Sequence, residues 1–126
     1  ETGLKLKKKL TPNQLSTGLF AWKVVKHTKS NAIVVAKNNK IISISGGQTS
    51  RVDATKIAFE KTKIPKGCIV ASDAFFPFKD SIEKMAQYNI AAIIQPGGSI
   101  RDKEVVESCN KNKIAMAFTG FRVFKH

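Results

Sequence analysis

The feature that most constrains the fold is the alternation of short, largely apolar runs with segments of helical pattern in the second half of the chain. The apolar runs are CIVAS (68–72), IAAIIQ (90–95) and IAMAFT (114–119). The segments of helical pattern precede them at 51–62, about 79–88 and 101–111. A strand that is apolar on both faces must be covered on both, which is typical of parallel strands joined by helices. The second half therefore predicts three helix–strand units of one parallel sheet.

The first half adds a helix and a hairpin to that sheet. Thr11 is a helix cap and Pro12 stands at the first helical position, so a helix is predicted from there to near Lys29. The runs AIVVAK and KIISIS flank Asn38-Asn39, and asparagine tolerates the positive φ of a tight hairpin turn. With right-handed crossovers, we predict an α/β fold: a three-layer α/β/α sandwich on a five-stranded mixed sheet.

The charge of the chain indicates an anionic partner. Its 126 residues are enough for one domain with a real core, and their formal net charge is +13. The lysines are spread over the whole length, and the one dense cluster, Lys5 with Lys7–Lys9, lies near the start. We therefore favour a phosphate-bearing ligand over a nucleic acid. We interpret residues 1–10 as a basic lead-in from a longer parent chain and residues 11–126 as the domain.

Two features bear on the cellular compartment. No apolar run approaches the roughly 18 residues that span a bilayer, and no charged-then-apolar signal segment is present. Cys68 and Cys109 share no metal-ligand or redox spacing, so we expect two buried, reduced thiols. We expect a cytoplasmic protein with no membrane partner.

The predicted sheet has one edge where a ligand would bind. Ligands of such sheets lie beyond the carboxyl ends of the parallel strands, next to helix N-termini. The loops 73–78, 95–99 and 119–122 are predicted to meet there, joined by GGQTSR (46–51). The stretch ASDAFFPFKDS also lies there, and its proline argues against a central strand. Its phenylalanines form either a core plug or a pocket wall, and the place at this edge favours the wall.

Four motifs at this edge are candidate binding groups, each with a plainer alternative. GGQTSR offers free N–H groups, a Ser50 cap and Arg51, but pattern alone favours a helix cap with a surface arginine. QPGGS (95–99) suits a ligand loop and a plain turn equally. Asp73 either caps its loop or holds a cation, and capping is commoner. Arg122 suits bidentate phosphate binding, although an exposed terminal arginine is the simpler interpretation.

The sequence pattern does not indicate a set of catalytic residues. His27 and His126 belong to no zinc spacing and no Ser-His-Asp arrangement, and the zinc-deaminase signature His-x-Glu…Pro-Cys-x-x-Cys is missing. Lys26-His27 falls on a predicted helix, where a half-exposed packing role is the simpler explanation. The residues alone predict an anion-friendly pocket without self-contained catalytic machinery.

Several segments resemble one enzyme family over nearly the whole chain. They are KSNAIVVAKNNK, GGQTSRVDATKIA, ASDAFFPFKDSI, IIQPGGSIRDKEV and IAMAFTGFRVFKH. Together they resemble the C-terminal part of AICAR transformylase, the folate-dependent half of a bifunctional purine-biosynthesis protein that also carries IMP cyclohydrolase. The resemblance implies two cytidine-deaminase-like subdomains without zinc, of which this chain is the second. It also implies formyl transfer from 10-formyltetrahydrofolate to the amine of AICAR, giving FAICAR and tetrahydrofolate.

The resemblance assigns roles to matching positions. It places Asn31, Arg51 and Phe75 at the AICAR base and carboxamide, and Arg122 at the phosphate. The residues implied on the folate side are Val52, Pro77, Phe78, Asp80, Ser99 and Ile100. Some relatives hold a buried potassium ion, for which the matching candidates are Val25, Thr28, Ser30, Asp73 and Val123.

Departures from the family pattern limit what the chain is expected to do alone. The family's catalytic Lys-His pair belongs to the earlier subdomain, and Lys26-His27 is not that pair. Ser81 stands where relatives vary between asparagine and glycine, so no folate contact is assigned to it. Family sites form between two subunits of a homodimer, so we expect the isolated piece to be inactive, with no catalytic residue of its own. The alternatives are a basic α/β module that binds nucleotides or nucleic acid, and a scaffold without a ligand.

Overall fold

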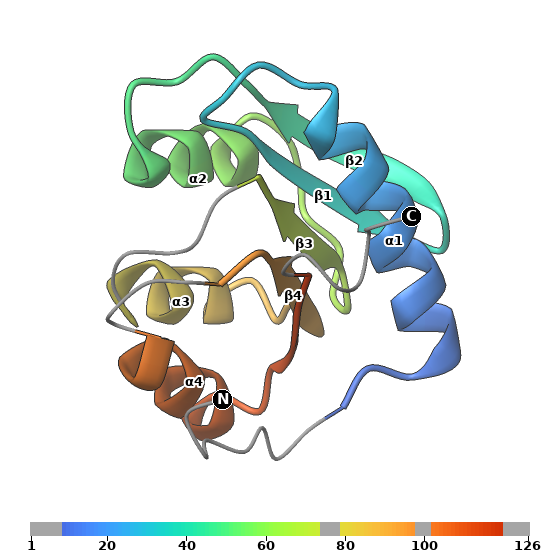
Figure 1. Ribbon diagram of the computed structural model, residues 1–126, viewed down its shortest axis with the longest axis vertical. Coiled ribbons are helices and arrows are strands. Elements are labelled where there is room, and N and C mark those ends of the chain that lie inside the picture. Colours follow the sequence, from blue (N-terminus) through green and yellow to red (C-terminus); the bar gives the residue numbers. More distant parts are fainter. Residues whose placement is uncertain (1–8, 74–78, 98–101, 120–126) are drawn as a thin grey trace.

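The computed structural model describes residues 9–73, 79–97 and 102–119, which form a layered α/β domain (Figure 1). The elements, in chain order, are α1 (Pro12–Lys26), β1 (Ile33–Lys37), β2 (Lys40–Ser45), α2 (Arg51–Glu60), β3 (Ile69–Ser72), α3 (Lys79–Ala86), β4 (Ala92–Gln95), α4 (Asp102–Lys111) and β5 (Ala115–Phe118). Every predicted helix and strand is present, and most are shorter by one to three residues at an end. The helix α1, predicted to reach Lys29, ends at Lys26 with His27 as its C-cap.

The five described strands form one mixed sheet in the order β2-β1-β3-β4-β5. The strands β3, β4 and β5 are parallel, as the apolar runs predicted. The strand β1 is antiparallel to both of its neighbours, β2 and β3. The sheet therefore changes from an antiparallel hairpin to a parallel set between β1 and β3.

The helices cover the two faces of the sheet unequally: α1 alone packs on one face, and α2, α3 and α4 pack on the other (Figure 1). Side chains alternate along each strand, so Val34 and Ala36 face α1 while Ile33 and Val35 face the other three helices. Two apolar cores result, one on each face, and the predicted three-layer sandwich is confirmed.

The helix α1 approaches its face closely because the facing residues are small. The core on that side includes Ala36, Ala71, Ala92 and Ala115. At Gly18, an added Cβ would lie 2.2 Å from Ile94 Cδ1, so either that side chain or the helix would have to shift. Packing therefore accounts for a glycine that weakens the helix itself.

The hairpin turn is the tight type that its asparagines predicted. Asn38 and Asn39 have φ values of 50° and 60°, in the region that asparagine tolerates best among residues with a side chain. The Asn39 N–H donates to Thr17 Oγ1 over 3.1 Å, which ties the turn to α1.

Chain direction brings loops from both halves of the sequence to one edge. Because β1 is antiparallel to its neighbours, its first residue, Ile33, pairs with Ser72 at the end of β3 and with Ser45 at the end of β2. The segment before β1, the loop 46–50 and Asp73 therefore meet at the edge where β4 and β5 also end. The described ends of the predicted loops lie at this edge, and residues 74–78, 98–99 and 120–122 of those loops lie outside the described residues.

Among the helices that the structure describes, none has the length and hydropathy needed to cross a lipid bilayer. Both cysteines are free and buried, as predicted.

Candidate functional site

Arg51, the first residue of α2, is the centre of a buried polar cluster at the sheet edge. Its side chain is 5% exposed. Nη1 donates to the Ala32 carbonyl over 2.9 Å, and Nη2 donates to Asn31 Oδ1 over 2.9 Å. Nη2 also lies 2.8 Å from Asp73 Oδ1 in an ion pair. The surface arginine favoured by pattern alone is wrong, because α2 begins directly over the start of β1 and turns this side chain inward.

Asp73 supplies the negative charge of the cluster from the end of β3. Its Oδ1 accepts from Arg51 and, over 3.2 Å, from the Ala32 N–H. Its Oδ2 accepts from Ser30 Oγ over 2.5 Å. The Asp73 N–H in turn donates to the Ala32 carbonyl over 3.4 Å. Both carboxylate oxygens are therefore engaged, and the chain segments before β1 and after β3 are clamped together.

Asn31 is the half-buried member of the cluster, and its amide has one orientation. Oδ1 accepts from Arg51, and Nδ2 donates to the Gln48 carbonyl over 2.9 Å. A flipped amide would set its N–H against the guanidinium and its oxygen against a carbonyl, losing both bonds. The fixed amide keeps one N–H and one lone pair for a further partner.

The loop 46–50 holds Asn31 and starts α2. The Asn31 N–H donates to the Gln48 carbonyl over 3.2 Å, and the Gln48 N–H donates to the Asn31 carbonyl over 3.4 Å. The Gly47 N–H donates to the Lys29 carbonyl over 2.6 Å. Ser50 caps α2, since its Oγ accepts from the Asp53 N–H over 3.0 Å. The predicted cap is confirmed, and it fixes where Arg51 leaves the helix.

Sequence reasoning missed the main-chain members of this cluster. The carbonyls of Ala32 and Gln48 orient Arg51 and Asn31, yet main-chain groups leave no trace in residue type. The available signals were that Ala32 follows Asn31 and that Gln48 belongs to the GGQTSR motif.

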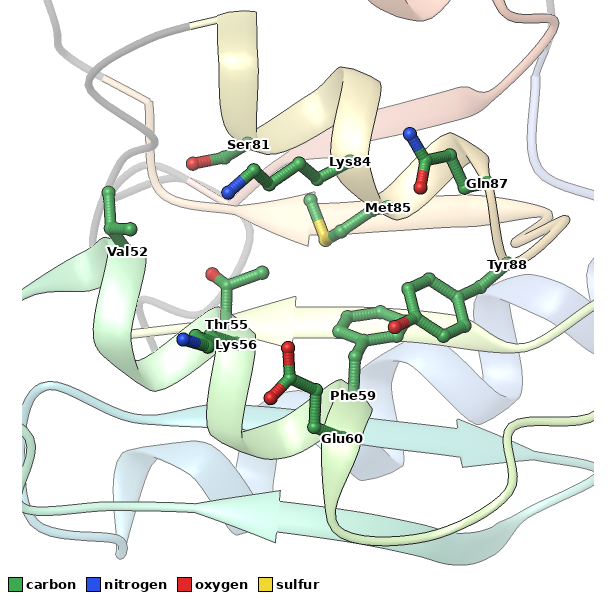
Figure 2. A pocket seen from close by; sticks show the side chains of 10 residues that line it. All are labelled: Val52, Thr55, Lys56, Phe59, Glu60, Ser81, Lys84, Met85, Gln87 and Tyr88. Atoms are coloured by element: carbon green, nitrogen blue, oxygen red, sulfur yellow. The ribbon is translucent and has the colours of Figure 1, made fainter.

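A cavity of about 430 Å³ lies between α2 and α3, and Val52, the residue after Arg51, is one of its lining residues (Figure 2). Figure 2 shows side chains of both helices pointing toward one another across it. Its lining residues are Val52, Thr55, Lys56, Phe59, Glu60, Ser81, Lys84, Met85, Gln87 and Tyr88. The spacing of the α2 members, three or four residues apart, places them on one helix face.

The cavity has an apolar wall and a cationic rim. The rings of Phe59 and Tyr88 lie 4.8 Å apart between centroids with a 41° tilt, and Met85 is fully buried behind them. Lys56 and Lys84 are exposed at its rim, against one acid, Glu60. Val52, which also lines the cavity, is 48% exposed. This combination suits a flat, partly aromatic ligand that carries negative charge.

The two thiols are poor candidates for chemistry. Burial raises the pKa of the Cys109 thiol to about 12. Burial also raises the pKa of the Cys68 thiol, and the nearby Lys37 only partly opposes that rise. Both sulfurs therefore stay protonated near neutral pH, where a thiol is a weak nucleophile.

The structure places the other predicted residues as follows. Phe75, Pro77, Phe78, Ser99, Ile100, Arg122 and Val123 lie outside the described residues, as does the side chain of Asp80 in α3. Lys26 and His27 lie exposed at the end of α1, and the half-exposed packing role expected for them stays a prediction.

The described potassium candidates are already hydrogen-bonded to the protein. The Val25 carbonyl accepts from the Thr28 N–H over 3.1 Å, and Thr28 Oγ1 donates to the Val24 carbonyl over 2.8 Å. Asp73 is paired with Arg51, whose charge would repel a cation bound there. Within the described ranges, no group of three or more His, Cys, Asp or Glu side chains is arranged to hold a metal ion. The Arg51 charge therefore opposes a cation at Asp73, and the potassium site stays an untested prediction.

Comparison with known proteins links the chain to one family. Residues 2–61 match the family model described as AICARFT/IMPCHase bienzyme. The chain is 56% identical over 124 residues to the bifunctional purine biosynthesis protein PurH of Aquifex aeolicus, covering 95% of the chain and 24% of that protein. It is 59% identical over 108 residues to PurH of Petrotoga mobilis, covering 86% of the chain and 21% of that protein. The chain thus spans about a quarter of the length of the curated relatives it matches.

Solved structures with a similar fold are far more distant in sequence. One is a diaminohydroxyphosphoribosylaminopyrimidine deaminase/5-amino-6-(5-phosphoribosylamino)uracil reductase from Thermotoga maritima, with a TM-score of 0.58 and 16% identity over 83% of the chain and 36% of that protein. Another is RibD of Acinetobacter baumannii, with a TM-score of 0.52 and 10% identity over 84% of the chain and 34% of that protein. At these identities the likeness shows the fold alone, and it confirms the predicted cytidine-deaminase-like architecture.

Proposed function

Because the chain belongs to the family of AICARFT/IMPCHase bienzymes, we propose that it forms the substrate-binding part of an AICAR transformylase. A role in purine biosynthesis is supported by its relatives, which are bifunctional purine biosynthesis proteins. The proposed reaction moves the formyl group of 10-formyltetrahydrofolate to the amine of AICAR, giving FAICAR, which the cyclohydrolase half of the parent protein closes to IMP. The observation that carries the proposal is the fixed Asn31 amide on the buried Arg51–Asp73 pair, at the edge where the strands end.

The Asn31 amide complements the carboxamide of AICAR. A primary amide offers one donor and one acceptor side by side, and Asn31 keeps one of each after its bonds to Arg51 and Gln48. Arg51 has used three N–H groups inside the protein, so its direct part in binding is limited to those that remain. We assign Asn31 the direct contact and Arg51 mainly its support, with Phe75 against the base and Arg122 on the phosphate.

The cavity between α2 and α3 supports a folate site next to AICAR. Val52, assigned to folate by family resemblance, is one of its lining residues. Its aromatic and methionine wall suits the flat rings of a folate, and Lys56 and Lys84 suit the carboxylates of its glutamyl end (Figure 2). Pro77, Phe78, Asp80, Ser99 and Ile100 remain proposed contacts on the same side.

The chain contributes binding and positioning, which do much of the work in formyl transfer. Holding amine and formyl group in reacting geometry converts a bimolecular step into an effectively unimolecular one. Proton transfer is assigned to the Lys-His pair of the preceding subdomain. We further propose a cytoplasmic, homodimeric parent enzyme that binds no nucleic acid or membrane, and an inactive isolated piece.

Titration of the full-length protein at two salt concentrations tests the proposed function. We expect saturable binding of AICAR and of a folate analogue at both 50 and 200 mM salt, because few charges are neutralised. A basic nucleic-acid module would instead bind an oligonucleotide, with affinity falling about 10³-fold or more between these concentrations for six or more phosphate contacts. Steep oligonucleotide binding without AICAR binding would reject the proposal. A scaffold would bind none of the three.

The two helix caps offer a matched pair of substitutions in the full-length enzyme. Ser50→Ala and Thr11→Ala each remove a capping oxygen, at a cost of about 1 kcal/mol in stability measured by urea unfolding. Only Ser50 fixes the start of α2 at Arg51. We therefore expect Ser50→Ala to raise the KM for AICAR about threefold and Thr11→Ala to leave it unchanged. Equal effects of the two substitutions on KM would mean that the cap does not position the site.

A further inference from the structure

We propose that Asp73 is a positioning residue for AICAR: it sets the direction of the Arg51 guanidinium, which in turn sets the Asn31 amide. The inference rests on the proposed function for the identity of the ligand. The structural part of the inference is that Asp73 orients Arg51 and Arg51 orients Asn31. That part depends only on the described contacts.

The first step is that Asp73 is held rigidly. It directly follows β3, and two hydrogen bonds with the main chain of Ala32 bracket it. Ser30 Oγ fixes the second carboxylate oxygen. A carboxylate with three donors on two oxygens has little freedom to rotate, so it presents Oδ1 in one direction.

The second step is that Arg51 follows that direction. Its Nη2 is shared between Asp73 Oδ1 at 2.8 Å and Asn31 Oδ1 at 2.9 Å. The guanidinium is planar, so once Nη1 bonds the Ala32 carbonyl and Nη2 bonds Asp73, the direction left for the second Nη2 hydrogen is fixed. That hydrogen is the one Asn31 accepts.

The third step is the difference in burial between Arg51 and Asn31. The side chain of Arg51 is 5% exposed, whereas Asn31 and Asp73 are both partly exposed. The guanidinium is therefore enclosed between its partners, while the Asn31 amide that it holds is partly open to a ligand. A neutral group at position 73 would leave the guanidinium without its charged partner and free to turn from Asn31.

The test compares Asp73→Asn with Asp53→Asn in the full-length enzyme. Asp53 lies on the same helix as Arg51, but among the described residues its carboxylate accepts only from Thr49 Oγ1, over 3.2 Å, at the surface. We expect Asp73→Asn to raise the KM for AICAR at least tenfold while the KM for 10-formyltetrahydrofolate stays within twofold. Asp53→Asn should change neither. Equal rises in both KM values for Asp73→Asn would overturn the inference, because a merely structural defect would damage both sites.

A double substitution tests whether Asp73 acts through Asn31. If it does, the KM for AICAR of the double variant Asp73→Asn/Asn31→Ala exceeds the wild-type KM by much less than the product of the two single effects. A full product would mean independent action and would overturn the inference. Should Asp73→Asn fail to fold, Ser30→Ala loosens the carboxylate while keeping the ion pair, and it is expected to raise the KM for AICAR about threefold. No change in KM for that variant would count against the inference.

A crystal structure of the ligand-free Asp73→Asn enzyme separates this inference from the proposed function. We expect the guanidinium of Arg51 to move out of hydrogen-bonding distance of Asn31 Oδ1. If it stays at the 2.9 Å seen here, Asp73 does not position it, whatever the ligand is. If wild-type enzyme fails to bind AICAR while the guanidinium moves as expected, the proposed function fails and the positioning role holds for another ligand.

Discussion

Replacing Arg51 by alanine is expected to lower the free energy of unfolding by about 3–5 kcal/mol, because it leaves a buried carboxylate without its cation. Asp73 is only 12% exposed and would lose the ion pair at 2.8 Å. The Ala32 carbonyl and Asn31 Oδ1 would lose their donors as well. Urea unfolding of the full-length protein, followed by a signal assigned to this domain, measures the loss.

Two further variants separate charge from geometry. Lys23→Ala removes an exposed cation from α1 and is expected to change stability by less than about 0.5 kcal/mol. Arg51→Lys keeps the charge but not the planar fork that reaches three partners at once, so it should recover only part of the loss. If Arg51→Ala costs no more than Lys23→Ala, the cluster does not hold the sheet edge together.

The strands and helices could be predicted because their signals are local. Apolar runs such as 90–95 and the Asn38-Asn39 turn reflect main-chain preferences and face alternation that a few residues decide. The ends of helices were predicted less accurately. The helix α1 ends at Lys26 because the side chain and N–H of Thr28 donate hydrogen bonds to the Val24 and Val25 carbonyls, and no capping residue in the sequence indicates this end.

The burial of Arg51 could not be predicted from the pattern, because it depends on tertiary structure. The strand β1 runs antiparallel to β3, which brings the residues before β1 beside Asp73. The Arg51 guanidinium is buried because it binds both of these segments. Arg51 and Asp73 are 22 positions apart, and neither looks unusual in its own segment. Family resemblance selected Arg51 for the site without indicating that it is almost wholly enclosed.

The contact between α2 and α3 that forms the cavity also could not be predicted from the sequence pattern. Val52, Thr55, Lys56 and Phe59 have the spacing of one helix face, which sequence can predict. That this face meets Ser81, Lys84 and Tyr88 of another segment depends on how α2 and α3 lie over the sheet (Figure 2). Arg51 belongs to the polar cluster and Val52, the next residue, lines the cavity, so the cluster and the cavity adjoin at these two positions. A substrate with a polar carboxamide and a second one with flat rings would meet at that point.

The Asn31 amide is the group on which AICAR recognition should depend most directly. Asn31→Ala is expected to raise the KM for AICAR about 10- to 100-fold, since it removes the contact and leaves Arg51 and the Gln48 carbonyl short of a partner. The KM for 10-formyltetrahydrofolate should stay within twofold. Steady-state kinetics of the full-length enzyme, varying one substrate at a time, measures both, with Asn13→Ala on the exposed face of α1 as a control.

Asn31→Asp separates the support of Arg51 from recognition of the ligand. A carboxylate at this position still accepts from Arg51, so the ion-pair cluster is kept, but it has no N–H for Gln48 or for an incoming carboxamide oxygen. We therefore expect the folded state to tolerate Asn31→Asp better than Arg51→Ala, while the KM for AICAR rises as much as in Asn31→Ala. A KM close to that of the wild type would show that the amide N–H is not used. The proposed pairing of Asn31 with the carboxamide would then be wrong even if the cluster is built as described. The cluster depends on the Arg51 N–H that Asn31 Oδ1 accepts, whereas the pairing depends on an N–H of the Asn31 amide.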